Sequence, residues 1–379
     1  MKKNFLLIMS LVILLCSNCT NNDNSIESGI TIYLDSIQYV ALKIGNIRYI
    51  PLETTDECIL GYADKVLIRN NRIYVADFNQ TMSLFVFDMS GKFLFKINRR
   101  GQGPGEYTSF RDFDLQNNEE IYMFDHLGKK LLIFDSEGNY LHNIIFEFSF
   151  RNFCLIENKI YISEVRGRNG KKVADLALYD IVNGETELLL DDEKYLYSIP
   201  LNNSQYKFYT SPNNTYYAPK LSETTFSVTK DSIIPLITIK GLPFFPKDLL
   251  ERWLSETNTS IRSDFFRNTE YFIENSYIYE TNDYISMQYV LGINSFDLLY
   301  NKQTKKAYKL LSTYFQDIGH YCIKGSTGIE FFSTVYFNNE NDYLKKILAS
   351  HEELKNVKED DNPVIVIFDL DMQSPEPLR

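Results

Sequence analysis

The chain has 379 residues, a formal net charge of −11, and hydrophobic residues at 44% of its positions. This length exceeds what one globular core usually fills, so the chain holds either two domains or a repeat architecture. The acidic balance argues against nucleic acid as a partner, because binding to phosphates needs a basic surface.

The first 19 residues have the pattern of an export signal. Met1-Lys2-Lys3 is basic, and residues 5–15 are almost wholly apolar. That run is too short to span a bilayer comfortably, which is typical of a secretory signal. Cys19 is predicted to be the lipidated residue. Lipidation at Cys16, or cleavage by an ordinary signal peptidase to give a soluble periplasmic protein, remains open. We expect an exported protein of the outer membrane or periplasm, which contacts the membrane by its lipid anchor alone, with residues 20–29 as a flexible tether.

A hairpin pattern recurs along the rest of the chain. Residues 84–94 and 131–141 each contain an apolar strand, an Asp-x-x-Gly turn and a second strand. The aspartate caps the turn through its side chain, and the glycine supplies the positive φ that such a hairpin requires. Weaker copies turn at residues 180, 230 and 301, and a last copy ends at Asp369 with no strand expected after it.

The spacing of these turns predicts the fold. Successive turns are 47, 45, 50, 71 and 68 residues apart, and the first three intervals match one four-stranded propeller blade. Each longer interval contains apolar residues at helical spacing, over residues 246–256 and 342–357. We expect the helix around Trp253 to pack on the side of the propeller. Residues 30–379 are therefore predicted to form an all-β, six-bladed β-propeller with two short helical insertions.

A second repeated strand precedes the hairpins. Residues 72–77 and 120–125 both contain an Ile-Tyr strand that ends in aspartate, and residues 159–162 match them more loosely. The strand at residues 47–52 has no blade of its own. Its pairing with the last strand would close the ring and remove exposed sheet edges.

Several of these segments resemble one family. Tyr74-Val75-Ala76-Asp77, Phe87-Asp88-x-x-Gly91 and above all Arg99-Arg100-Gly101-Gln102-Gly103-Pro104-Gly105-Glu106-Tyr107 are similar to the six-bladed β-propeller lipoproteins of Bacteroides-type bacteria, which are akin to NHL-repeat propellers. Residues 359–364 also resemble that family. The resemblance covers nearly all of the mature chain and implies the fold and export. It implies no settled activity and no catalytic residues.

The glycine-rich stretch is the first candidate site. Its glycine spacing fits neither a dinucleotide fingerprint nor a phosphate-binding P-loop. In a propeller it would link two blades on the face where ligands usually bind. The candidate ligand-binding residues on this face are Arg99, Arg100, Glu106, Tyr107, Arg111 and His126. Two arginines beside an aromatic ring could bind a sugar acid or another carboxylate. The alternative is a rigid turn whose arginines pair with Glu106 and Asp112.

Other polar residues are expected to serve the fold. Asp77 and Asp125 end equivalent strands, so a structural capping role is favoured over calcium binding. Cys58, Cys154 and Cys322 are predicted to be buried thiols, although one disulfide is possible in an oxidising compartment. The histidines do not have zinc-site spacing, and we expect no metal and no cofactor.

Three functions remain open. The leading hypothesis is a cell-envelope lipoprotein that binds a glycan, a peptide or an envelope protein across the propeller face, because no catalytic signature is present. The alternative is a polysaccharide lyase or hydrolase whose site lies in the channel, with Tyr107, His126 and the arginines as the acting residues. The third is a structural subunit that contacts its complex through the helical insertions.

Overall fold

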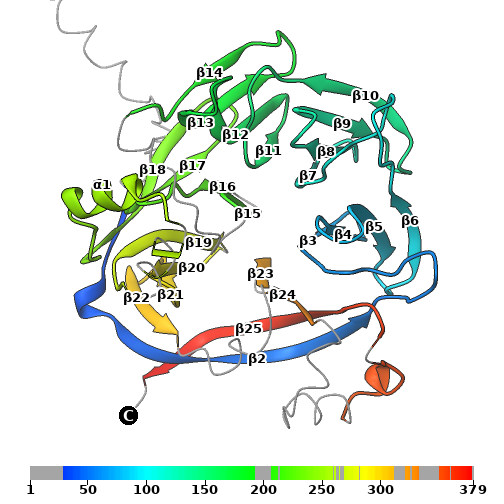
Figure 1. Cartoon of the computed structure of the whole chain (residues 1–379). Helices are drawn as coiled ribbons and strands as arrows, with labels where there is room; N and C mark the ends of the chain where they lie inside the picture. Colours follow the sequence, from blue (N-terminus) through cyan, green and yellow to red (C-terminus); the bar gives the residue numbers. More distant parts are fainter. Residues whose placement is uncertain are drawn as a thin grey trace, which may run out of the picture.

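A computed structural model describes residues 29–192, 206–211, 214–258, 260–261, 264, 269–280, 282–310, 321–324, 327–332, 350–358 and 360–377. The predicted export signal lies outside these residues. The regular secondary structure of the described residues is almost entirely β-strand, arranged as a ring of sheets around a central axis (Figure 1). The predicted all-β propeller is therefore confirmed.

Three sheets contain four consecutive strands each. The first comprises β3 (Lys65–Arg69), β4 (Arg72–Asp77), β5 (Ser83–Asp88) and β6 (Phe93–Ile97). The second comprises β7 (Asp112–Leu115), β8 (Ile121–Asp125), β9 (Lys130–Phe134) and β10 (Tyr140–Ile145). The third comprises β11 (Phe153–Ile156), β12 (Lys159–Arg166), β13 (Lys172–Asp180) and β14 (Thr186–Leu188). In each sheet the first strand lies nearest the centre of the ring (Figure 1).

The other two sheets include strands from the N-terminal part of the chain. One comprises β15 (Phe208–Ser211), β16 (Asn214–Tyr217), β17 (Thr224–Val228) and β18 (Ile233–Lys240), to which β1 (Ile30–Tyr33) adds in parallel. The last has eight strands in the order β19-β20-β21-β22-β2-β25-β24-β23. Its bounds are β19 (Phe272–Glu280), β20 (Tyr284–Leu291), β21 (Asn294–Asn301), β22 (Lys306–Leu310), β2 (Gln38–Pro51), β25 (Val364–Pro377), β24 (Thr327–Phe332) and β23 (Tyr321–Lys324).

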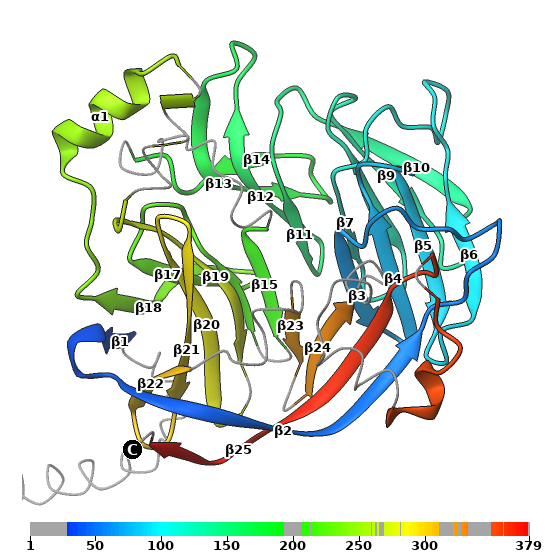
Figure 2. The same cartoon turned by 60° about the horizontal axis from the view of Figure 1, so that its bottom comes forward.

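The prediction of six separate blades is corrected to five sheets. The cause is β2, a 14-residue strand that has partners on both edges. It pairs in parallel with β22 and antiparallel with β25, so two groups of strands merge into one sheet (Figure 2). The expected pairing of residues 47–52 with the last strand is confirmed, since Ile50 faces Ile365. The expected end of that strand at Asp369 is wrong, because β2 offers partners as far as Pro377.

The predicted turn chemistry is confirmed in the first two sheets. The Asp88 carboxylate accepts hydrogen bonds from the Ser90 hydroxyl and from the amides of Ser90 (2.8 Å) and Lys92 (3.0 Å). These bonds, and most strongly the one from the hydroxyl, lower the pKa of Asp88. Gly91 follows with φ +86°. A side chain at that position would meet the Pro51 carbonyl oxygen at 2.1 Å, so glycine is required there for both reasons.

Polar contacts join the innermost strands of the first three sheets. Lys65 on β3 donates to the Asp112 carboxylate on β7 at 2.7 Å, and that carboxylate accepts the backbone amide of Phe153 on β11 at 3.1 Å. Asp114 accepts the amide of Leu155 in the same way, at 2.8 Å. Apolar side chains fill the space between neighbouring sheets. These contacts hold the strands that line the channel in fixed relative positions.

One predicted helix lies fully within the described residues. Helix α1 (Lys247–Ser255) matches the expected span, and Trp253 is 4% exposed against Ile273 and Val290. Its apolar stripe therefore packs on the propeller, as expected. Half of the second predicted helix, residues 342–349, lies outside the described residues, and the described half, residues 350–357, contains the short η4 (Glu352–Leu354). No helix in the described part of the chain is long and apolar enough to cross a membrane.

Candidate functional site

The glycine loop, residues 99–107, is a rigid turn held by its own polar groups. Tyr107 is buried, and its hydroxyl donates to the carbonyl of Met82 at 2.7 Å. Burial raises the pKa of Tyr107 to about 12, so this hydroxyl stays protonated at physiological pH. The Glu106 carboxylate accepts the amide of Gly103 at 2.8 Å. The side chains that made the loop a candidate site are thus largely occupied within it.

The two arginines of the glycine loop lie on its surface. Arg99 and Arg100 are exposed, and neither forms an ion pair with another residue that the structure describes. The expected pairs with Glu106 and Asp112 are absent there, since Asp112 binds Lys65 instead. Arg99 borders a shallow hollow of about 540 Å³ on the outer side of the first two sheets.

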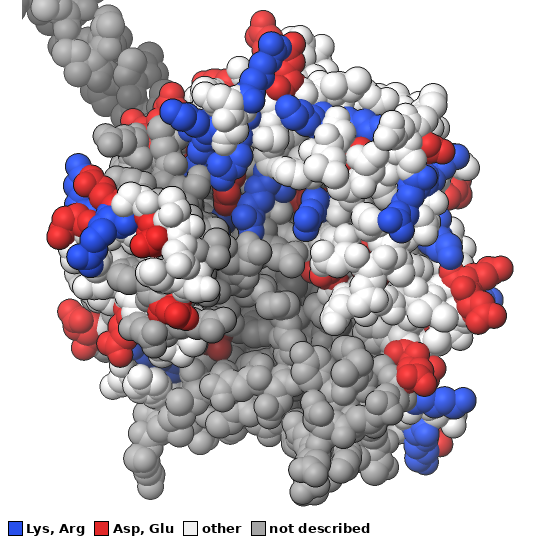
Figure 3. Space-filling model, viewed as in Figure 1, with Lys and Arg blue, Asp and Glu red and all other residues white. Residues whose placement is uncertain are grey.

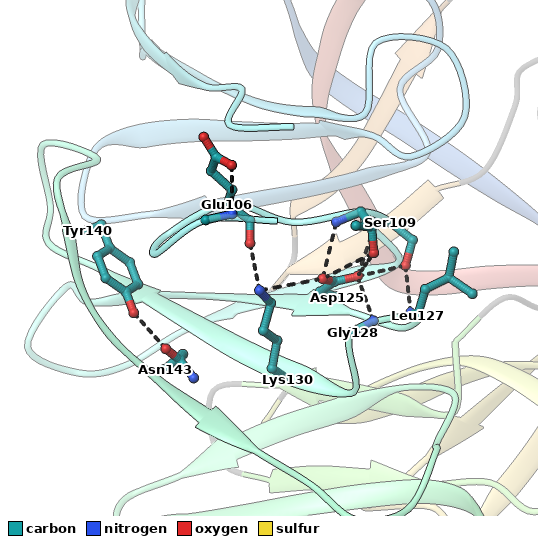
Figure 4. A network of polar contacts seen from close by, with 10 residues as sticks. Glu106, Ser109, Asp125, Leu127, Gly128, Lys130, Tyr140 and Asn143 are labelled. Atoms are coloured by element: carbon teal, nitrogen blue, oxygen red, sulfur yellow. Dashed lines mark hydrogen bonds and ion pairs between the residues drawn. The ribbon is translucent and has the colours of Figure 1, made fainter. Parts of the chain in front are cut away.

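The Asp125 carboxylate organises the next turn (Figure 4). It accepts the backbone amides of Thr108 (3.1 Å), Ser109 (3.0 Å) and Gly128 (3.1 Å). Lys130 lies 3.9 Å from it and donates to the carbonyl of Glu106, at 2.7 Å. The carboxylate is therefore used to join two loops, and the contacts support its predicted capping role.

Asp77 does the same in the first sheet. Its carboxylate accepts the amides of Gly61 (2.9 Å), Gln80 (2.9 Å) and Thr81 (3.1 Å). It is fully buried, and these backbone donors compensate for its burial. The aspartate repeated at the ends of equivalent strands therefore has the same structural role in both sheets. Within the described residues, no three His, Cys, Asp or Glu side chains are grouped so that they could hold a metal ion.

A second polar site lies between the sheets β7–β10 and β11–β14. It is a pocket of about 320 Å³. We call it the arginine pocket, and it is lined by Arg111, His126, Phe150, Arg151, Asn152, Glu164 and Arg166. Arg111 precedes β7, His126 follows β8, residues 150–152 precede β11, and residues 164 and 166 end β12. Four separate segments therefore meet there.

Backbone pairing and aromatic stacking fix the walls of the pocket. The amide of Arg111 donates to the carbonyl of Phe124 at 3.1 Å, which anchors the loop that carries this arginine. The rings of Phe124 and Phe150 stack with their centroids 3.8 Å apart. The Nδ1 atom of His126 lies 3.1 Å from the carbonyl oxygen of Phe150. The pocket is thus assembled before any ligand arrives.

Glu164 is the acidic residue of the pocket. Its carboxylate lies 3.9 Å from Arg151 and 3.9 Å from Arg166. Burial opposes its ionisation, but the positive charges of Lys220 and Arg151, with others nearby, outweigh burial and lower its pKa. Its backbone has φ +49°, a left-handed conformation that is unfavourable for a residue with a side chain.

Further charges lie behind the pocket. Lys207 and Glu274 form an ion pair of 2.7 Å with side chains 1% and 0% exposed, and Lys172 pairs with Asp175 in a similarly buried position. Burial and the neighbouring charge of Lys207 lower the pKa of Lys220 to about 8. The cations outnumber the carboxylates in this region, although the chain as a whole is acidic. Figure 3 shows Lys and Arg side chains along the upper edge of the central hollow, over β7, β11 and β12.

Asn152 differs from its polar neighbours. It lines the pocket and is 4% exposed, and its Oδ1 atom has no hydrogen-bond partner among the described residues. Its backbone is fully engaged in pairing with Ser163. A buried amide oxygen without a donor costs about 1–3 kcal/mol, so a donor that reached this atom would recover that free energy.

The structure places the six candidate ligand-binding residues in two separate regions. Arg111 and His126 meet in the arginine pocket, whereas Arg99, Arg100, Glu106 and Tyr107 belong to the glycine loop. Because the hydroxyl of Tyr107 is buried and donates to the carbonyl of Met82, just before β5, the Arg/His/Tyr group that would have favoured the enzyme hypothesis is not assembled in the described residues.

Sequence reasoning missed Arg151, Asn152, Glu164 and Arg166, although a signal for two of them was present. Ser109-Phe110-Arg111-Asp112-Phe113 and Ser149-Phe150-Arg151-Asn152-Phe153 are copies of one motif, placed before the innermost strand of successive sheets. The motif brings an arginine from each copy to the same pocket. The motif also places Asp112 and Asn152 at equivalent positions. Asp112 pairs with Lys65, whereas the side-chain oxygen of Asn152 has no donor among the described residues.

The two cysteines whose side chains the structure describes line neither site. Cys58 and Cys154 are free and buried, and burial raises the pKa of the Cys154 thiol well above its usual value. A buried thiol held protonated is a poor nucleophile. Cys322 lies in β23, and its side chain is outside what the structure describes.

Comparison with known proteins defines the class to which this propeller belongs. The family described as "Domain of unknown function (DUF4934)" matches residues 24–369. The chain therefore belongs to that family. No curated protein matches the chain.

Two of the many solved structures that match illustrate the shared fold. The "Putative exported protein" of Bacteroides fragilis NCTC 9343 has a TM-score of 0.69 and 18% identity, over 89% of this chain and 98% of that one. A member of the DUF4221 family from Bacteroides vulgatus has a TM-score of 0.50 and 10% identity, over 87% of this chain and 98% of that one. At such identities the likeness establishes the propeller fold.

Proposed function

We propose that this chain is an exported, lipid-anchored propeller of the cell envelope that binds an anionic ligand in the arginine pocket. The observation that carries the proposal is the collection of Arg111, Arg151 and Arg166 around one pocket in a protein with a net charge of −11. Acidic surfaces repel anions, so a local group of arginines is placed against the overall charge. Guanidinium groups are also the side chains best suited to hold a carboxylate or another oxyanion.

The size and rigidity of the pocket support a small ligand. Ligand pockets usually measure about 300–1,000 Å³, and the arginine pocket, at about 320 Å³, lies at the lower end. Its arginine-bearing loops are anchored by backbone hydrogen bonds and stacked rings, so little ordering remains to be done on binding. Helix α1 packs Trp253 against the propeller. The hypothesis of a structural subunit that contacts its complex through this helical insertion therefore has less support.

The test of binding uses three simple anions: sulfate, succinate and glucuronate, with glucose as the neutral control. Binding to the purified full-length protein is measured by calorimetry at low salt. At least one anion should bind, and Arg151→Ala should weaken it about 10-fold or more, as expected when a charge-assisted bond of about 1.5–3 kcal/mol is lost. Arg168→Ala is the matched control, because Arg168 is 78% exposed and pairs with Glu147 away from the pocket. Equal losses in the two variants, or no anion binding at all, would refute the proposal.

The proposed localisation rests on the N-terminal sequence and has a separate test. The basic start and the apolar run before Cys19 support export and lipidation. The name of the Bacteroides fragilis neighbour, an exported protein, agrees with this. In a native-like host, Cys19→Ala should move the protein from the membrane to the soluble fraction, whereas Cys16→Ala should not. Membrane association that survives Cys19→Ala would exclude this anchor.

A further inference from the structure

The unpartnered oxygen of Asn152 narrows the chemistry of the ligand. We propose that the arginine pocket recognises an acidic sugar, a hexuronate-like residue whose carboxylate binds the arginines while a neighbouring hydroxyl donates to Asn152 Oδ1 and Glu164. The inference rests on the proposed anion site and goes beyond it by naming the class of ligand.

The first step is the pairing of an acceptor with an anion site. Arg111, Arg151 and Arg166 outnumber Glu164 in the pocket and favour a negative group there, whereas Asn152 Oδ1 lacks a hydrogen-bond donor among the described residues. A simple oxyanion such as sulfate has acceptors alone and would leave Asn152 unpaired. The preferred ligand must therefore carry an acid group and a donor next to each other.

The second step is the identity of the donor. An ammonium group could donate to Asn152 and Glu164, as in an amino acid. The cations around Glu164, including Lys220, Lys207 and Lys172, make the region unfavourable for another positive charge. A neutral hydroxyl suffers no such repulsion. This selects an acid with hydroxyl groups rather than an amino acid.

The third step concerns Glu164 itself. Its carboxylate reaches between Arg151 and Arg166, so the pocket contains an acceptor beside its positive groups. A site built for a bare anion would be weakened by this negative charge. A ligand that carries several hydroxyls around one carboxylate uses both Glu164 and Asn152 as acceptors. Unlike a general anion site, the pocket is thus complementary to a polyol acid.

The decisive experiment compares ligands that differ in one feature. Calorimetry on the full-length protein measures glucuronate, a disaccharide that ends in glucuronate, succinate, sulfate, N-acetylalanine and a fully O-methylated glucuronate. Glucuronate should bind at least about 10-fold more tightly than succinate, sulfate or N-acetylalanine, since a site built to accept a hydrogen bond from a hydroxyl rejects analogues that lack one. The O-methylated sugar should lose this advantage on the unaltered protein. The disaccharide distinguishes recognition of a glycan end, where it binds at least as well, from recognition of the free sugar acid.

Asn152→Leu provides the matched protein test. It removes the acceptor at similar volume, so the affinity for glucuronate should fall about 10-fold while that for sulfate changes less than twofold. If glucuronate binds no better than succinate, or the methylated sugar binds equally well, the acidic-sugar assignment is wrong but the anion site stands. If no anion responds to Arg151→Ala, the anion site itself is wrong. Equal or tighter binding of N-acetylalanine would instead point to a peptide terminus and overturn the assignment.

Discussion

The glycine loop and the arginine pocket are neighbours in the chain, but they are built in opposite ways. In the loop, Tyr107 and Glu106 turn inward and bond to the backbone of the same region. In the pocket, residues from four segments bring together arginines, a carboxylate and an amide oxygen without a partner among the described residues. The loop is locally saturated, whereas the pocket retains unused hydrogen-bonding capacity, and such capacity is what a ligand needs.

Backbone conformation shows the same contrast. Gly105 has φ +73° in the loop, where glycine adopts a left-handed conformation at little cost. Glu164 has φ +49° in the pocket, where a residue with a side chain is strained. The register of β12 with β13 also shifts between Val165 and Arg166, and irregular pairing of this kind can redirect a side chain. The loop is thus optimised for stability, while the pocket retains strain beside its charged groups.

The largest expected effect tests whether the loop is structural. Gly105→Ala should lower the free energy of unfolding by about 2–4 kcal/mol, because the new Cβ would lie 2.6 Å from the ring of Tyr140 and the backbone is left-handed. Urea unfolding would measure this change. Anion affinity under native conditions should remain as in the unaltered protein.

Gly170→Ala is the matched control for Gly105→Ala. Gly170 has a similar φ of +76°, but a Cβ there would meet nothing within 4 Å. Gly170→Ala should lower the free energy of unfolding by only about 1 kcal/mol, because the left-handed backbone is then the sole source of the cost. If the two variants are equally stable, the close packing of the loop against Tyr140 does not contribute. If Gly105→Ala abolishes anion binding while it remains folded, the loop takes part in the site and the contrast fails.

An intermediate effect is expected behind the pocket, at Lys220. Burial and the charge of Lys207 lower its pKa to about 8, whereas an unfolded lysine has a pKa of about 10.4. The unfolded state therefore binds more protons between pH 8 and 10, and the free energy of unfolding should rise with pH in that window. Below pH 8 the cost of the buried charge is fully present.

Removal of that charge should stabilise the protein. Lys220→Met should raise the free energy of unfolding at pH 7 by about 1–3 kcal/mol and flatten its rise between pH 8 and 10. It should also weaken anion binding, because one nearby cation is lost. Lys230→Met, at a side chain 54% exposed, is the control and should change stability little. A less stable Lys220→Met variant with an unchanged pH profile would show that the cation cluster is not under strain.

Much of the fold could be predicted because its signals are local. The Asp88 turn, the Ile-Tyr strand of residues 72–77 and the helix around Trp253 each depend on residues close together in the sequence. The pairing of the N-terminal strand β2 with the last strand β25 could be predicted by counting the repeated hairpins, since one strand at each end lacked a partner. The number of sheets did not, because β2 pairs on both edges and local patterns do not show how many partners a strand will have.

The site was harder to predict because its residues come from four segments. Arg111 and His126 were proposed for their place near the glycine loop, and they lie in the pocket for another reason, the meeting of two neighbouring sheets. Arg151 and Asn152 were detectable only as the second copy of a motif whose first copy contains Arg111. Glu164 gave no sequence signal, since its importance depends on a strained backbone and on charges distant in the chain.

The smallest expected effect is the most direct test of the contrast between loop and pocket. Arg99 and Arg100 are the residues that the sequence brought forward first, and the structure places both on the exposed surface of the glycine loop. Replacement of both by alanine should change the free energy of unfolding by less than about 0.5 kcal/mol, as is usual for exposed side chains away from special features. Glucuronate affinity should change less than twofold at a salt concentration that screens distant charges. If the double replacement lowered glucuronate affinity 10-fold while Arg151→Ala left that affinity unchanged, the binding site would lie in the glycine loop and the assignment to the arginine pocket would be wrong.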